Sequence, residues 1–188
     1  MTYQDSIRDI SSYRLQIADL RKKMRDLQSD IEPEKVQDYD FSTLTGNVKL
    51  SQLFREKKIL FVIHNMGIGC PYCTLWADGF NGILGHLQDR AAFVMSTPDT
   101  PGKQHSFAES RGWNFTMVSH EGTNFAEDMG YKGDDHWQPG ISVFKKREGQ
   151  IIRVSNTSFG PGDDFCNIWH IFDLIPEGPD GWQPKYKY

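Results

Sequence analysis

The sequence predicts an α/β protein with a mixed central sheet flanked by helices and preceded by an extra, long N-terminal helix. Three observations support this fold class. All 17 glycines lie from Gly46 onward, and the glycine-free segment before it has the apolar spacing of one continuous helix. Behind that segment, short apolar strands alternate with helical segments, which is typical of parallel strands. Near the C-terminus, two strand-like segments flank Arg147-Glu148-Gly149, which indicates an antiparallel hairpin.

Length and composition limit the classes of function. The 188 residues suffice for one globular domain with an appendage, and 38% hydrophobic and 24% charged residues exclude a collagen or a disordered chain. The net charge of −4 argues against nucleic acid and acidic membranes as partners. The longest apolar run, Ile59 to Ile63, is too short to cross a bilayer, and residues 1–12 lack the apolar segment of a secretion signal. We therefore expect a soluble, cytoplasmic protein.

We expect three parts in the chain: an amphipathic helix with its linker (residues 1–37), a folded domain (residues 38–178) and a C-terminal tail (residues 179–188). The helix has one apolar stripe at spacings of three and four residues. The stripe consists of Ile10, Tyr13, Ile17, Leu20, Met24, Leu27 and Ile31. It fills heptad positions a and d for about three heptads, near the minimum for a coiled coil. A homodimer through this helix and a helix packed on its own domain both explain the stripe.

The folded domain should begin with a short hairpin around residues 45–47 and continue with alternating elements. The expected strands are 59–64, 91–96, 115–118, 141–146 and 150–155, and the expected helical segments are 73–87, 103–111, 124–129 and 163–174. The alternating half requires right-handed parallel crossovers, and the hairpin adds antiparallel strands to the same sheet. This is the element order of the thioredoxin fold.

The pair Cys70-Pro71-Tyr72-Cys73 lies at the junction of the first central strand and its helix. Pro71 suits the first helical turn, which places Cys70 at the helix N-terminus, where unpaired N–H groups favour a thiolate. Cys73 follows one turn later and can close a disulfide with Cys70. The spacing predicts thiol–disulfide exchange without a cofactor, with Cys70 as the nucleophile and Cys73 as the resolving thiol. The substrate would be a disulfide-containing protein or a small thiol.

Two further residues complete the expected site. Pro139 directly precedes the strand 141–144, where thioredoxin-like proteins carry a cis-proline, so we expect a cis bond that frames the substrate groove. His64 ends the first central strand, six residues before Cys70. Thioredoxins usually carry an acidic residue there, which shuttles the proton of the second cysteine, and a buried imidazole can do similar work. A histidine that only packs in the core is the alternative.

A metal site is the competing interpretation of the cysteines. Cys166 and His170 are spaced i, i+4 on the last expected helix, so together with Cys70 and Cys73 they would supply a Cys₃His zinc set. That set requires the last helix to lie beside the first. The protein would then be a non-catalytic metal-binding or redox-sensing interaction module with an oligomerising N-terminal helix. If the helices are apart, Cys166 is a small buried core residue.

The longest motif in the chain runs from Gly69 to Gly82 and reads Gly-Cys-Pro-Tyr-Cys-Thr-Leu-Trp-Ala-Asp-Gly-Phe-Asn-Gly. It resembles the signature of a bacterial thioredoxin-like family of unknown function, whose members typically read Gly-Cys-Pro-x-Cys followed by Phe-Trp-Ala-Asp-x-Phe-Asp-Gly. The similarity covers residues 38–178 and includes segments 112–115, 118–119, 139–144, His170 and 173–174; Asn81 replaces the usual Asp. The resemblance implies a thioredoxin-like fold and a thiol redox role.

Two related classes fit the sequence less well. The Cys-Pro-Tyr-Cys tetrad is also that of glutaredoxins, but their Thr-Val-Pro before the cis-proline strand is Trp137-Gln138-Pro139 here, which argues against glutathione use. The insertion between Phe115 and Tyr131 is similar to that of peroxiredoxins. Their Pro-x-x-x-Thr-x-x-Cys loop is missing, because residues 64–70 contain neither the Pro nor the Thr. A peroxidase is therefore the weaker interpretation.

Overall fold

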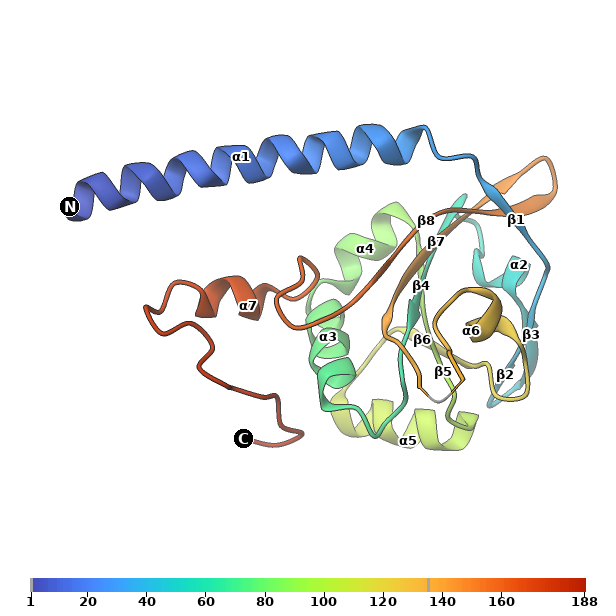
Figure 1. The fold of residues 1–188 in the computed structure, drawn as a ribbon. Coiled ribbons are helices and arrows are strands. Elements are labelled where there is room, and N and C mark those ends of the chain that lie inside the picture. Colours follow the sequence, from blue (N-terminus) through green and yellow to red (C-terminus); the bar gives the residue numbers. More distant parts are fainter. Residues whose placement is uncertain (1, 135) are drawn as a thin grey trace. The chain divides into compact units, whose positions relative to one another are not determined.

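The computed structural model describes residues 2–134 and 136–188, and the chain forms two compact units, residues 1–33 and 34–188 (Figure 1). The first unit is the long helix α1 (Tyr3–Ser29). Thr2 begins it with a capping box, in which its hydroxyl accepts the Asp5 N–H and the Asp5 carboxylate accepts the Thr2 N–H. No residue between Tyr3 and Ser29 is buried. The long N-terminal helix expected from the apolar stripe is therefore confirmed.

The second unit is built on an eight-stranded mixed sheet with the order β1-β8-β7-β4-β5-β6-β2-β3. The strands are β1 (Glu34–Val36), β2 (Asp40–Thr43), β3 (Gly46–Lys49), β4 (Ile59–His64), β5 (Ala92–Thr97), β6 (Thr116–Ser119), β7 (Gly140–Arg147) and β8 (Gln150–Ser158). The central strands β4, β5 and β6 are parallel, and β7 runs antiparallel to both β4 and β8. The predicted mixed α/β fold is confirmed.

Helices cover both faces of this sheet. They are α2 (Leu50–Leu53), α3 (Pro71–Gly82), α4 (Leu84–Arg90), α5 (Pro101–Arg111), α6 (Phe125–Asp128) and α7 (Asn167–Phe172). Alternate residues of β4 enter two separate cores. Leu60 and Val62 pack with α2 and α6, whereas Ile63 packs with α3, α5 and α7. We call these two sides the α6 face and the α3 face of the sheet.

Two expected helices have different bounds in the structure. The segment expected as one helix over 73–87 is two helices, α3 and α4, because Ile83 leaves the helical conformation at φ −116°. The last helix begins at Asn167 rather than near residue 163. The Asp163 carboxylate accepts the N–H groups of Phe165 and Cys166, and these bonds hold a turn where the helix was expected to start. None of the described helices has both the length and the apolar character needed to cross a membrane.

Candidate active site at the start of α3

A short loop links the end of β4 to α3 and fixes the position of Cys70. The Asn65 side chain accepts the Gly67 N–H at 2.8 Å, and the Asp99 carboxylate accepts the Ile68 N–H at 2.8 Å. Gly67 has φ +103°, and a Cβ there would lie 2.8 Å from Asp99 Oδ2. Only glycine satisfies both the backbone conformation and the close carboxylate. The loop is therefore tied to the segment that follows the neighbouring strand, β5.

Cys70 is the N-cap residue of α3, with Pro71 in the first turn as expected. Its Sγ accepts two hydrogen bonds from Cys73, one from the thiol and one from the backbone N–H at 3.0 Å. The thiol of Cys73 is the main cause that lowers the pKa of Cys70 to about 7, and it outweighs partial burial, which acts in the opposite direction. A large share of Cys70 is therefore a thiolate at neutral pH.

The second cysteine has the opposite acidity. The pKa of Cys73 is raised well above its ordinary value, because its thiol donates to Cys70, because it is buried, and because Cys70 is negatively charged. Cys73 is 3% exposed, whereas Cys70 is half-buried, and both thiols are free. The pair therefore consists of one accessible, ionised sulfur with a protonated sulfur directly behind it. Chemically, such a pair can attack a disulfide and then release the product by closing its own disulfide.

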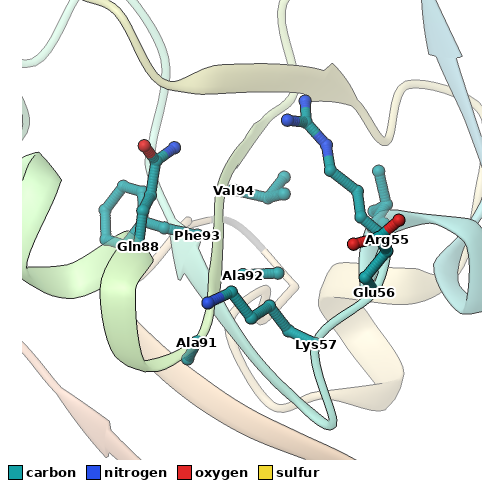
Figure 2. Close-up of a pocket in the computed structure, with 9 residues that line it drawn as sticks. Arg55, Glu56, Lys57, Gln88, Ala91, Ala92, Phe93 and Val94 are labelled. Carbon is teal, nitrogen blue, oxygen red and sulfur yellow. The ribbon is translucent and has the colours of Figure 1, made fainter.

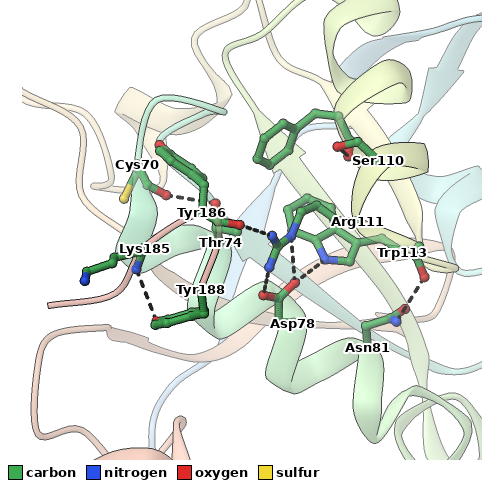
Figure 3. Close-up of polar contacts among 12 residues, drawn as sticks. Cys70, Thr74, Asp78, Asn81, Ser110, Arg111, Trp113, Lys185, Tyr186 and Tyr188 are labelled. Carbon is green, nitrogen blue, oxygen red and sulfur yellow. Dashed lines mark hydrogen bonds and ion pairs between the residues drawn. The ribbon is translucent and has the colours of Figure 1, made fainter.

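The C-terminal tail reaches this site, which the sequence did not reveal. Tyr186 donates its hydroxyl hydrogen to the Ile68 carbonyl at 3.0 Å, and its ring meets Phe107 edge to face at 6.1 Å between centroids. Its backbone carbonyl accepts from Arg111 Nη1 at 2.7 Å (Figure 3). Burial raises the pKa of Tyr186, and electrostatic interaction with Cys70 and Cys73 raises it further. The bond to Ile68 attaches the tail two residues before Cys70.

Arg111 is itself held by a carboxylate on α3. Asp78 accepts from Arg111 Nε at 3.3 Å and from Arg111 Nη2, and it also accepts the Trp113 indole N–H at 2.8 Å (Figure 3). This network connects α3, α5 and the tail. Asp78 belongs to the motif that runs from Gly69 to Gly82. Its partners Arg111 and Trp113 lie more than thirty residues away in the sequence, so the motif alone did not predict the network.

His64 lies on the other side of the sheet from α3. Its ring stacks on Tyr131 at 3.7 Å between centroids and on Phe125 at 5.3 Å, and Nε2 lies 2.9 Å from Ser142 Oγ. Both aromatic residues belong to the core of the α6 face. Burial lowers the pKa of His64 well below its ordinary value, so the imidazole is neutral. These contacts match the alternative of a histidine that packs in the core of the α6 face.

The bond before Pro139 is trans, so the expectation of a cis-proline is wrong; no peptide bond among the described residues is cis. In the segment that leads into β7, the Gln138 N–H donates to the Tyr131 carbonyl at 2.8 Å. The Pro139 carbonyl accepts the Phe159 N–H at 2.8 Å. Pro139 still precedes Gly140, which pairs with His64, so it lies at the same end of the sheet as the loop to Cys70.

The zinc set Cys70, Cys73, Cys166 and His170 is not assembled. Within the described residues, no group of three or more His, Cys, Asp or Glu side chains is arranged to hold a metal ion. Cys166 is buried, and burial raises its pKa. His170 is exposed and lies near Asp164 and Asp173 instead. Helices α3 and α7 contribute to the same core, but among the described residues Cys70 and Cys73 do not form a metal-binding group with Cys166 and His170.

A cavity of about 390 Å³ lies elsewhere, at the start of β5 (Figure 2). Its lining includes Arg55, Lys57 and residues 91–94. Because β4 and β5 are parallel and Cys70 follows the end of β4, this cavity is at the opposite end of the central strands from the thiols. It plays no part in the candidate site.

Comparisons with known proteins agree with this fold. The sequence model of the family described as "Bacterial protein of unknown function (DUF899)" matches residues 12–187, which includes most of α1 and the tail up to Tyr186 and Lys187. No curated protein matches the sequence.

Among solved structures, reduced Prx3 from Vibrio vulnificus is similar with a TM-score of 0.57 and 13% identity, over 71% of this chain and 89% of that chain. A peroxiredoxin-like protein from Aquifex aeolicus gives a TM-score of 0.52 at 15% identity, over 67% and 74% of the two chains. A hypothetical protein from Sinorhizobium meliloti gives 0.53 at 13% identity, over 84% and 88%. At these identities, the likeness shows a thioredoxin-type fold shared with peroxiredoxins.

Proposed function

This chain belongs to the bacterial DUF899 family, and we propose that it is a thiol–disulfide oxidoreductase in which Cys70 attacks and Cys73 resolves. One observation carries the proposal. The Cys70 sulfur, at the start of α3, accepts two hydrogen bonds from Cys73, and its pKa is lowered to about 7. The three free cysteines suit a reducing compartment, so we also propose that the protein acts in the cytoplasm.

The reaction proceeds in two exchange steps. The Cys70 thiolate attacks one sulfur of a substrate disulfide, the S–S bond of the substrate breaks, and the leaving sulfur takes a proton from solvent. Cys73 then gives its proton to solvent and attacks Cys70 Sγ, which breaks the mixed disulfide and expels the second substrate sulfur as a thiolate that takes up a proton. The substrate has gained two electrons and two protons, and the protein holds a Cys70–Cys73 disulfide. A thiol reductant returns the protein to the dithiol state.

The substrates that suit this chemistry are a disulfide-containing protein or the disulfide form of a small thiol. The fold shared with peroxiredoxins raises hydroperoxide reduction as a rival, but residues 64–70 carry neither the Pro nor the Thr of the peroxidatic loop. A redox-sensing module would form the same Cys70–Cys73 disulfide without turnover. Assays with a disulfide and with a hydroperoxide in parallel distinguish these three functions.

The test measures reduction of a chromogenic aromatic disulfide and of a model protein disulfide, with an excess of thiol reductant. Cys70→Ser should lose activity with both substrates, and Cys73→Ser should accumulate a mixed disulfide that mass spectrometry detects. Cys166→Ser is the matched control and should keep its activity. Full activity in Cys70→Ser, or consumption of hydroperoxide alone by the unmodified protein, would contradict the proposal.

A further inference from the structure

Helix α1 exposes an apolar seam that its own unit leaves uncovered. The seam consists of Ile10, Tyr13, Ile17, Leu20, Met24 and Leu27, whose exposed fractions range from 43% for Ile10 to 72% for Leu27. Isolated helices are marginally stable in water unless an apolar face is packed, and large exposed apolar patches mark contact surfaces. We propose that α1 pairs with α1 of a second copy of this chain in a parallel, two-stranded coiled coil.

The residue types in the seam select this partner and this number of strands. With Ile10 at heptad position a, the other a positions are Ile17 and Met24, and the d positions are Tyr13, Leu20 and Leu27. Isoleucine at a together with leucine at d favours parallel dimers over trimers and tetramers, because the two positions offer different packing geometries. A second copy presents the same seam in register.

The charges beside the seam favour the parallel direction. Asp9 occupies a g position and Arg14 the following e position. In a parallel pair, g of one helix faces the next e of the other, so each Asp9 faces Arg14 of the second copy. In an antiparallel pair, e faces e, and Arg14 would face Arg21 of the second copy. Like charges at these positions oppose association.

The full chain should therefore sediment with the mass of two copies. Leu20→Glu places a charge in the seam and should give monomers, whereas the control Leu15→Glu changes a leucine that is 74% exposed at an f position and should leave the dimer intact. The thermal transition of residues 34–188 should be the same in both variants. A monomeric or trimeric unmodified chain, or a dimer that survives Leu20→Glu, would overturn the proposal.

Charge reversal tests the direction. Arg14→Asp places two acidic residues opposite each other in a parallel pair, so it should raise the dissociation constant several-fold. The double variant Asp9→Arg, Arg14→Asp restores opposite charges and should recover the original affinity. If Arg14→Asp alone tightens the dimer, the helices are antiparallel, and the proposed arrangement is wrong.

A second inference concerns the tail and rests on the proposed function. An open groove of about 440 Å³ lies between the loop before Cys70 and α5, and its lining includes Ile68, Lys103 and Phe107. Tyr186 contacts two of these, through its hydrogen bond to the Ile68 carbonyl and its ring against Phe107. The tail therefore lies at the border of this groove, against the loop that leads to Cys70.

We infer that Tyr186 is a specificity-determining residue that admits small disulfides to Cys70 and disfavours protein disulfides. Cys70 is only half-buried, so a small disulfide can reach its sulfur without moving the tail. A protein surface has to displace Tyr186 and thereby lose its contacts with Ile68, Phe107 and Arg111. Only bulky substrates therefore have to break these contacts before they reach Cys70.

The test compares alkylation of Cys70 by iodoacetamide with alkylation by a maleimide carrying polyethylene glycol. Tyr186→Ala should raise the rate of alkylation by the bulky maleimide, relative to the rate with iodoacetamide, several-fold. Tyr188→Ala is the control and should leave this ratio unchanged, because Tyr188 is 85% exposed and its hydroxyl accepts the Lys185 N–H. An unchanged ratio in Tyr186→Ala would overturn the inference. If the unmodified protein alkylates but reduces no disulfide, the proposed function fails, and the ratio still decides the role of Tyr186.

Discussion

Two cysteines, Cys70 and Cys166, occupy the same position at the start of a helix and have opposite acidities. Cys70 is the N-cap residue of α3 and Cys166 that of α7. The pKa of Cys70 is lowered to about 7, whereas the pKa of Cys166 is raised. A position at a helix N-terminus is therefore not sufficient to activate a thiol.

The difference lies in what surrounds each sulfur. Cys70 Sγ accepts from the thiol and the N–H of Cys73, and α3 has 12 residues. Burial is the main cause that raises the pKa of Cys166, and the opposing influence of the Ile168 N–H is smaller. The Asp163 charge raises the pKa of Cys166 further, and α7 has only six residues. Donors to the sulfur and the absence of a nearby carboxylate distinguish the reactive thiol.

The largest expected effect is a difference in alkylation rate between the two thiols at pH 7. The Cys70 thiol, with a pKa of about 7, is half ionised there. An ordinary thiol with a pKa of about 8.5 is only about 3% ionised at this pH, and the raised pKa of Cys166 leaves it less ionised still, so Cys70 should react at least about tenfold faster. The Cys70 rate should rise with pH and level off above about pH 8. Quantifying the two alkylated peptides by mass spectrometry measures this. Equal alkylation rates would show that Cys70 and Cys166 do not differ in acidity.

Removing the donor to Cys70 should make it resemble Cys166. Cys73→Ala takes away the thiol but keeps the backbone N–H, so the pKa of Cys70 should rise by about 1–2 units, the loss expected for one hydrogen bond to a charged group. Cys73→Ser keeps a donor and should cause a smaller rise. The pH dependence of Cys70 alkylation in both variants measures the shift. A Cys70 pKa that stays near 7 in Cys73→Ala would assign the activation to the helix alone.

Removing the carboxylate near Cys166 should have a smaller effect in the other direction. Asp163→Asn deletes a negative charge and keeps an oxygen that can accept the N–H groups of Phe165 and Cys166. The pKa of Cys166 should fall, while burial keeps it above that of Cys70. Alkylation of Cys166 should accelerate at pH 8, and Cys70 in the same sample is the internal control. A slower Cys166 would show that the carboxylate does not act through its charge.

The smallest effect is expected from Tyr186→Phe. The tyrosine is neutral at pH 7, so losing its hydroxyl should leave the pKa of Cys70 unchanged to within about 0.3 units. The same alkylation profile measures this. A larger change would mean that the tail contributes to the acidity of Cys70, in addition to limiting access to it.

Local patterns predicted much of the fold and the centre of the site. The spacing of Pro71 behind Cys70 correctly predicted a helix start at the pair, because proline suits the first turn and nothing distant is needed. The alternation of strands and helices predicted the parallel strands of the mixed sheet, because this pattern is also local in the sequence. The hairpin of β7 and β8 follows from Glu148 and Gly149, which both adopt positive φ in its two-residue turn.

Features that depend on distant partners could not be predicted. Tyr186 contacts Ile68 and Arg111, which lie 118 and 75 residues before it in the sequence. No local spacing in the tail indicates these contacts. The role expected for His64 depended on which face of the sheet α3 covers, and the strand pattern alone does not specify that. The trans bond at Pro139 is consistent with the hydrogen bond from Gln138 to Tyr131, which forms only in the folded domain.

The coupling between the Cys70 and Cys73 thiols has a consequence for the timing of the proposed reaction. Cys73 holds its proton because it donates to an ionised Cys70 and lies beside that charge. Once Cys70 has bonded to a substrate sulfur, both influences end, and only burial still opposes ionisation of Cys73. The second thiol thus becomes a better nucleophile after capture than before it. The two proposed exchanges would then follow a fixed sequence, because Cys73 becomes easier to ionise only after Cys70 has reacted.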